Sequence, residues 1–192
     1  MALALQGQYV APTEVADILE AASSGDDRAW SELVERYARR VFALARSRCR
    51  DAELAEEITQ SVFVTVAEKL GKGEYQEQGK FEAWLFRVTM NRVRDEIRRA
   101  NRQAIPVAPE ILNGRARADA SGDGDALEAL RRAMASLSDP DRDIIELRHH
   151  GQLSFRQIAD LLDEPLGTLL ARHHRALKKL KDLLQAGGID HD

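Results

Sequence analysis

The sequence is poor in cysteine and in aromatic residues: Cys49 is its only cysteine, and aromatics make up 5% of its 192 residues. A single cysteine excludes an intrachain disulfide. No apolar run is long enough to cross a bilayer. The N-terminal stretch MALALQGQYV has neither a basic start nor a long apolar segment, so we expect no signal peptide. These absences together predict a cytoplasmic protein.

The common signatures of catalysis are also missing. The sequence has no phosphate-binding glycine loop, no nucleophile elbow and no paired catalytic acids. His149-His150 and His173-His174 are adjacent pairs, and because neighbouring helical residues point about 100° apart, neither pair has the spacing of metal ligands. Cys49 falls at an inward helical position, which is typical of a buried thiol. We therefore expect no enzymatic activity, no bound metal and no cofactor.

Charge is plentiful but sorted along the chain. The sequence has 28 basic and 32 acidic residues, for a net charge of -4. The acids gather around residues 51–57 and 119–128, whereas residues 87–102 carry six arginines against two acids, and residues 165–181 carry no acid at all. The negative total argues weakly against nucleic-acid binding, but local gathering of positive charge matters more for the choice of partner.

Apolar residues recur at helical spacing through most of the chain, and no alternating strand pattern is convincing, so we predict an all-α fold. The expected inward stripes are Trp30, Leu33, Tyr37, Val41, Leu44 and Ala45; Ile58, Val62, Phe63, Val66 and Leu70; Phe81, Leu85, Val88 and Val93; and Leu127, Leu130, Met134 and Leu137.

One long break divides these stripes. Residues 103–125 contain two prolines and three glycines and show no sustained period, which predicts a flexible linker. We therefore expect two small helical domains, with an N-terminal extension (1–25), a first domain (26–102), the linker (103–125), a second domain (126–186) and a tail (187–192). A linker of this length stretches to roughly 75 Å, which matches the ~70 Å between DNA sites two helical turns apart.

The stretch FRQIADLLDEPLGTLLARHHRALKKL, residues 155–180, has the pattern of a helix-turn-helix. Ser154 and Gln157 form a capping box at the start of the first helix. The sequence Asp163-Glu164-Pro165 ends that helix, because proline disfavours a helical residue before it. Gly167-Thr168 then opens a second, basic helix, so we place the helix-turn-helix in the C-terminal domain.

This second helix has the chemistry of a DNA reader, since an acid beside the phosphates would repel them. Thr168 can donate its hydroxyl to a phosphate, the arginines can read bases or phosphates, and Leu170 can only make apolar contacts, for instance with a thymine methyl. The candidate residues for an upstream DNA element are Thr168, Leu170, Ala171, Arg172, Arg175, Lys178 and Lys179. An ordinary helical hairpin with a solvated basic face remains the alternative.

Residues 137–184 resemble region four of the bacterial sigma factors of the extracytoplasmic-function (ECF) group. The family pattern is roughly L-P-x-x-x-R-x-x-x-L-R, then G-x-S-x-x-E-I-A-x-x-L, then P-x-G-T-V-K-S-R-x-x-R-A. The chain departs from it at Gln157, where the family usually has glutamate, at Leu170, where it has a basic residue, and at His173, where it has an inward apolar residue. The matching residues are Leu137, Arg142, Leu147-Arg148, Gly151, Ser154, Ile158-Ala159, Leu162, Pro165, Gly167-Thr168, Arg172 and Arg175-Ala176.

The stretch AEEITQSVFVTVAEKL, residues 55–70, resembles part of region two of the same family. The resemblance implies that this helix docks on the clamp helices of the largest polymerase subunit. Its polar and acidic face would then meet the partner, although Ser61 replaces the usual glutamate. The candidate polymerase-binding residues are Asp51, Glu56, Glu57, Thr59 and Gln60. A merely solvated face is the alternative.

The stretch KFEAWLFRVTMNRVRDEIRR, residues 80–99, resembles the region-two pattern F-x-x-W-L-x-x-I-x-x-N-x-x-x-D-x-x-R-R. The resemblance implies that this helix and the preceding loop, residues 71–80, contact the downstream promoter element and hold an unpaired base. A base pocket needs polar edges and an aromatic wall, and an asparagine amide can read a base edge. The candidate downstream-element residues are Tyr75, Gln76, Lys80, Asn91, Arg92, Arg94, Arg98 and Arg99.

The resemblance covers about residues 26–184. It implies a promoter-specificity subunit that binds the RNA polymerase core, through the clamp of its largest subunit, and recognises the −10 and −35 elements of promoter DNA. Members of this family commonly have an anti-sigma inhibitor protein as a further partner. Two alternatives stay open: a helix-turn-helix regulator that never joins polymerase, and a sigma-like interaction protein whose DNA recognition is weakened at Leu170 and His173.

Overall fold

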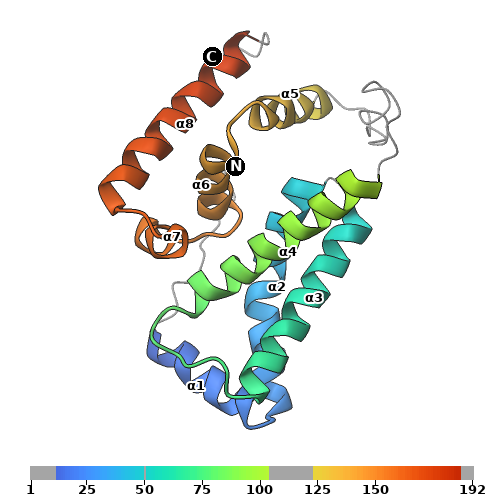
Figure 1. Ribbon diagram of the computed structural model, residues 1–192, viewed down its shortest axis with the longest axis vertical. Helices are drawn as coiled ribbons and strands as arrows, with labels where there is room; N and C mark the ends of the chain where they lie inside the picture. The colour runs from blue at the N-terminus through green and yellow to red at the C-terminus, as the bar shows by residue number, and fades with distance from the viewer. Residues whose placement is uncertain (1–11, 50, 104–122, 187–192) are drawn as a thin grey trace.

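The computed structural model describes residues 12–49, 51–103 and 123–186, and these residues form eight α-helices and no strand, which confirms the predicted all-α fold. Figure 1 shows the helices in two groups, α1–α4 and α5–α8. Their bounds are α1 (Pro12–Ser23), α2 (Asp27–Cys49), α3 (Ala52–Gly71), α4 (Phe81–Gln103), α5 (Asp123–Ala135), α6 (Asp139–His149), α7 (Phe155–Leu162) and α8 (Leu166–Ala186).

The first group is a bundle in which α2 contacts α1, α3 and α4. The apolar stripes predicted for α2 and α3 are buried, except that Trp30 is half-buried. Helix α1 adds Leu19, which is only 3% exposed, to the same core. Part of the stretch expected as an N-terminal extension therefore packs on α2 and α3.

The second group contains the predicted helix-turn-helix, formed by α7 and α8. Both hydrogen bonds of the capping box are present between Ser154 and Gln157, as predicted. Helix α7 ends at Leu162, and Asp163 adopts the left-handed conformation with φ of 56°. Helix α8 begins at Leu166, and its inward residue Leu169 is fully buried. The helix-turn-helix is thus confirmed.

The inward stripe predicted for α5 is wrong over its first half, because Leu127 and Leu130 are 47% and 38% exposed. Helix α5 packs on α8. Ala133 near its C-terminal end is buried, and Leu137, two residues beyond the helix, is buried against Ile145 of α6 and Ala176 of α8. The Arg142 guanidinium fixes that end by donating to the carbonyl oxygens of Met134 and Ala135.

The turn between α6 and α7 depends on a glycine. A Cβ at Gly151 would lie 2.6 Å from the carbonyl oxygen of Leu147, which is closer than real Cβ atoms come to a neighbour. The chain folds back this tightly because the Leu153 amide donates to that same oxygen over 3.1 Å. Gly151 thereby sets the position of α7 relative to α6.

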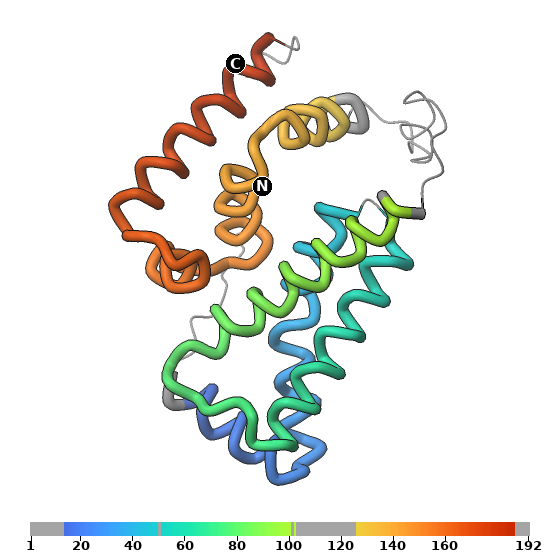
Figure 2. Tube along the Cα trace, in the orientation of Figure 1, coloured from blue at the N-terminus to red at the C-terminus, as the bar shows by residue number. Residues whose placement is uncertain are grey.

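The two groups also pack against each other. Helix α4 contacts α7, and α2 contacts α6, an arrangement that can be followed along the trace in Figure 2. One cluster of buried apolar side chains includes both Phe86 of α4 and Ile158 of α7. The division into separate domains stays a prediction, and most of the predicted linker lies outside the described residues. Within the described ranges, none of the helices combines the length and the apolar character that a membrane crossing requires.

Candidate polymerase and promoter interfaces

Helix α8 presents most of its predicted DNA-reading residues to solvent. Arg172 is the exception, because it is half-buried and forms an ion pair with Glu164 of the preceding turn. The exposed residues are Thr168, Leu170, Ala171, Arg175, Lys178 and Lys179. The acid-free face of α8 is therefore open to a partner, although one of its arginines is already partly neutralised.

His173 fills the inward position of α8 through aromatic contacts. Its ring lies edge-on to Phe155, with centroids 4.9 Å apart, and stacks near His149 at 6.4 Å. Burial lowers the pKa of His173, and the nearby charges of His149, Arg148 and His174 lower it further. A neutral ring replaces an apolar side chain here, so this departure from the family pattern leaves the helix-turn-helix packed.

Helix α4 carries the candidate reader of the downstream element, Asn91, on an exposed position. Arg98 and Arg99 are exposed and make only long pairs, of 3.7 and 3.9 Å, with acids of their own helix. Such surface pairs contribute little, so both guanidinium groups remain available for phosphates. Arg92 is half-buried, and Arg94 is bonded to Asp143 of α6.

The loop before α4 is held by an aromatic cluster. The Tyr75 ring lies 4.4 Å from that of Trp84 and 5.8 Å from that of Phe81. Its hydroxyl donates to Glu77, and burial, followed by this carboxylate, raises the Tyr75 pKa well above its ordinary value. Gln76 and Lys80 are exposed beside it. Trp84 is half-buried against Tyr75, a contact that the sequence did not predict.

Helix α3 carries the expected polymerase-binding face. Glu56, Glu57 and Gln60 are exposed. Asp51 is exposed as well and also caps the helix, accepting from the amides of Glu53 and Leu54. Thr59 is half-buried, and its hydroxyl donates to the carbonyl oxygen of Ala55. These two side chains therefore have local structural roles.

Val64 is 58% exposed on the same face of α3 and was missed by the sequence reasoning. It follows Glu57 by seven residues and Gln60 by four, so the three share one side of the helix. The sequence did contain a signal for this exposure, because Val64 is an apolar residue that shares a helical face with the polar residues Glu57 and Gln60.

In the part of the chain that the structure describes, no three or more His, Cys, Asp or Glu side chains lie close enough together to hold a metal ion. Cys49 is half-buried, and its burial raises the thiol pKa to about 11, with Glu96 and Asp51 adding to the shift. The thiol is therefore protonated, and unreactive as a nucleophile, near neutral pH.

Comparison with known proteins agrees with the resemblance that the sequence carries. Residues 33–103 match sigma-70 region 2, and residues 133–182 match sigma-70 region 4. The chain is 31% identical over 170 residues to ECF RNA polymerase sigma factor SigE of Mycolicibacterium smegmatis, covering 84% of this chain and 65% of that protein. It is 24% identical to the sigma factor SigW of Bacillus subtilis, over 84% of this chain and 91% of the relative.

Solved structures show the same fold. CnrH, solved in complex with the cytosolic domain of CnrY, superposes with a TM-score of 0.68 at 26% identity, over 89% of this chain and 97% of CnrH. The sigma factor RpoE of Bartonella quintana, solved with the anti-sigma factor NepR, gives a TM-score of 0.61 at 20% identity, over 82% of this chain and 98% of RpoE.

Proposed function

The chain belongs to the ECF sigma factors, the promoter-specificity subunits of bacterial RNA polymerase, and we propose that it divides promoter recognition between α4 and α8. In this scheme α8 enters the major groove of the upstream element, while α4 and the loop before it hold the melted downstream element. Polymerase performs the chemistry, so this chain acts without catalysing a reaction, and we place it in the cytoplasm with its polymerase.

The observation that carries this proposal is the exposure of two separate basic faces on a net acidic chain. The α8 face contains Arg175, Lys178 and Lys179, and the α4 face contains Arg98 and Arg99; all five are exposed. Because cations beside phosphates release counterions, each face favours DNA. A chain of charge -4 has little general attraction for DNA, so polymerase must deliver both faces to the promoter together.

The acidic face of α3 supports a different contact. Glu56, Glu57 and Gln60 are exposed. The two glutamates carry the sign opposite to both DNA-facing surfaces, which suits a basic protein partner rather than DNA. We propose that this face, with Val64 at its C-terminal end, docks on the clamp of the largest polymerase subunit.

An inhibitor protein is a further proposed partner. CnrH and the Bartonella quintana RpoE were each solved in complex with a second protein, and NepR is named an anti-sigma factor. By that similarity we propose that an anti-sigma protein binds this chain as well.

Run-off transcription tests the main proposal. Core polymerase stripped of its own specificity subunit is combined with the purified chain on a promoter selected from the transcripts that rise on overexpression. We expect a discrete transcript that depends on the chain. Failure to bind core would favour a regulator independent of polymerase, and core binding without a transcript would favour the interaction protein with weakened DNA recognition.

A further inference from the structure

The exposed face of α8 has an apolar edge and a basic edge. Neighbouring helical residues point about 100° apart, so residues that are three, four or seven positions apart line up along one side. The apolar edge consists of Leu166, Leu170 and Leu177, which are 42%, 42% and 38% exposed. The basic edge begins with an exposed hydroxyl and continues with exposed cations: Thr168, Arg175 and Lys179. A partner of α8 therefore meets leucines on one side and positive charge on the other.

The first two turns of α8 offer little free charge. Over residues 166–172 the one charged side chain is Arg172, which is half-buried and paired with Glu164 of the preceding turn. Gly167 and Ala171 lie between the two edges and are small and exposed. Since the N-terminal residues of a recognition helix contact the base edges, this helix can approach the bases closely and presents apolar groups to them.

The major groove contains one apolar group that such a surface can contact, the C5-methyl group of thymine. The Leu170 side chain has no donor or acceptor, so it cannot bond the amino, carbonyl or ring-nitrogen groups of the other base edges. Covering those polar groups without a hydrogen bond costs free energy. A leucine at this point of α8 therefore favours thymine at the base pair it meets and disfavours the other bases.

We propose that Leu170 makes recognition of the upstream element depend on the C5-methyl group of a thymine, and that Leu166 contacts a second such methyl group. This inference rests on the function proposed above. The Cβ atoms of residues four apart in a helix lie about 5–6 Å from each other, and successive bases of a strand rise by about 3.4 Å. The two thymines therefore lie within about two base steps of each other.

Charge favours DNA over a protein as the partner of the apolar edge. Residues 165–181 contain no acid, and the turns after Leu170 carry a row of exposed cations, Arg175, Lys178, Lys179 and Lys181. Phosphates neutralised by such a row supply much of the affinity for a duplex. The leucines of the first two turns thus meet the bases while the later turns hold the backbone.

A uracil scan of the upstream element tests the proposal, because uracil differs from thymine in lacking the C5-methyl group. Each thymine of a promoter chosen by run-off transcription is replaced singly, and binding of polymerase carrying this chain is measured by competition. At the position that Leu170 contacts, uracil should lower the affinity about fourfold, which corresponds to about 0.8 kcal/mol for one buried carbon group. The responding positions should number one or two and lie close together.

Leu170→Ala should remove the response at its own position, so that polymerase carrying this variant binds the thymine and uracil duplexes equally. Such a cycle isolates the contact between one side chain and one methyl group. Leu177→Ala is the matched control, because it truncates a similarly exposed leucine about 10 Å further along the helix axis. It should keep the fourfold difference, and circular dichroism establishes that both variants retain their helices.

Cytosine and 5-methylcytosine provide an independent comparison, since they share their hydrogen-bonding groups and differ by the same methyl group. Replacing the responding T·A pair by C·G should weaken binding of the original chain. Methylating that cytosine should then recover about fourfold in affinity, the same gain as one buried carbon group. Polymerase carrying Leu170→Ala should not distinguish the two duplexes.

Several outcomes would overturn the methyl contact. They are an upstream element without thymine, thymines that all tolerate uracil, and a uracil effect that persists in Leu170→Ala. If Leu170→Ala instead weakens binding of core polymerase in the absence of DNA, the apolar edge contacts a protein and the proposal is wrong.

The proposed function is judged separately, by run-off transcription with the original sequence. A transcript whose promoter shows no methyl dependence would leave the function standing and contradict the methyl contact alone. If no transcript forms, the function is wrong, and so is the inference that rests on it.

Discussion

The ring of Tyr75 lies 4.4 Å from the ring of Trp84, so the loop before α4 is anchored to the helix by an aromatic pair. Tyr75 remains half-buried rather than fully enclosed. The aromatic pair is therefore partly open to solvent.

We predict that Tyr75→Ala weakens binding of the downstream single strand by polymerase carrying this chain. Stacking of a base on an aromatic ring contributes about 1–3 kcal/mol. Tyr75→Phe keeps the ring and loses only the hydrogen bond to Glu77, so it should bind almost normally. Equal losses in both variants, measured by fluorescence anisotropy of a labelled strand, would assign the effect to the hydroxyl instead.

Asn91→Ala should slow open-complex formation while leaving polymerase binding nearly unchanged, because Asn91 is an exposed residue of α4, whereas the proposed polymerase-binding face belongs to α3. The measurement is permanganate reactivity of the melted promoter, beside a core-binding titration. An equal loss in the two assays would refute the reading role of this amide.

Arg172→Ala should cost about 1–3 kcal/mol at the upstream element if the guanidinium reads a base. The comparison variant is Glu164→Gln, which removes the carboxylate that pairs with Arg172 and should strengthen binding. Affinities on matched and mismatched duplexes decide the role. A loss that is uniform across sequences would make Arg172 a phosphate contact only.

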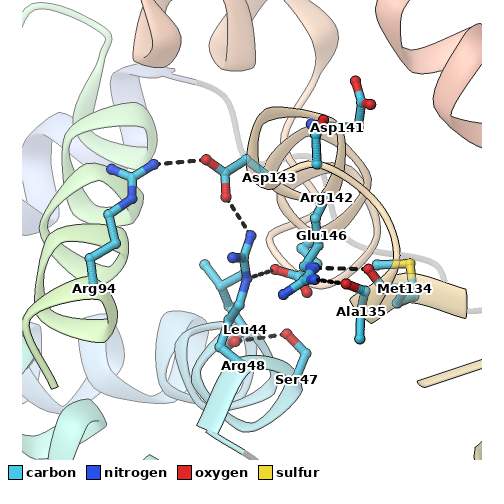
Figure 3. A network of polar contacts seen from close by, with 11 residues as sticks. Leu44, Ser47, Arg48, Arg94, Met134, Ala135, Asp141, Arg142, Asp143 and Glu146 are labelled. Atoms are coloured by element: carbon cyan, nitrogen blue, oxygen red, sulfur yellow. Dashed lines mark hydrogen bonds and ion pairs between the residues drawn. The ribbon is translucent and has the colours of Figure 1, made fainter. Parts of the chain in front are cut away.

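Arg48→Met should destabilise the contact between the two groups by up to about 3–5 kcal/mol, because it leaves the buried carboxylate of Glu146 without its partner and Asp143 with Arg94 alone (Figure 3). Opening of the contact lets these carboxylates hydrate, which limits the loss. Denaturant unfolding followed by circular dichroism, with an exposed arginine variant such as Arg39→Met as control, provides the measurement.

The same variant should show a defined pH dependence. Burial raises the pKa of Glu146 above its ordinary value, against the lowering effect of Arg48. The folded chain therefore keeps the Glu146 proton to higher pH than the unfolded chain does. The stability that comes from this difference is fully present below the Glu146 pKa of the unfolded chain, and it is lost as the pH rises through the Glu146 pKa of the folded chain. Without Arg48 the Glu146 pKa rises further, so Glu146 is more readily protonated and needs no cation at low pH. The stability that Arg48→Met loses should therefore be smaller at about pH 5 than at about pH 8. If the stability lost on Arg48→Met does not depend on pH, the titration of Glu146 does not contribute to it.

Gly151→Ala should destabilise the second group by about 1–3 kcal/mol, as overpacking does, because the added Cβ meets the Leu147 carbonyl oxygen at 2.6 Å. Gly167→Ala is the matched control, since a Cβ there has nothing within 4 Å and should change stability by less than about 1 kcal/mol. Thermal unfolding of both variants measures the difference. Similar midpoints would mean that the turn relaxes around the methyl group.

Features that depend on neighbours in sequence were predictable. The capping box of Ser154 and Gln157 and the end of α7 at Leu162 follow from local hydrogen bonding and from the proline after them. The buried stripes of α2 and α3 follow from helical period. The stripe of α5 was mispredicted at Leu127, because periodicity shows which residues share a face but not whether another helix covers it.

The roles of single polar residues were less predictable. Asp51, a candidate for the acidic docking face, also caps α3, because a side chain at a helix start can bond its own backbone; its docking role stays a prediction. Gln157 looked like a departure from the family pattern, and its amide is the donor that α4 requires at Glu82. Pairing of this kind depends on which surfaces meet.

By itself the sequence determined the helices, the helix-turn-helix and the sorting of charge into basic and acidic faces, since each of these depends on residues within a few turns of one another. Only the tertiary structure decided which charges are free. Arg94 and Asp143 are 49 positions apart in the chain, and Arg48 and Asp143 are 95. No local periodicity connects residues so distant, and their pairing exists only because α2 packs against α6 and α4 against α7. Arg48 is buried there, whereas Arg94 stays 44% exposed.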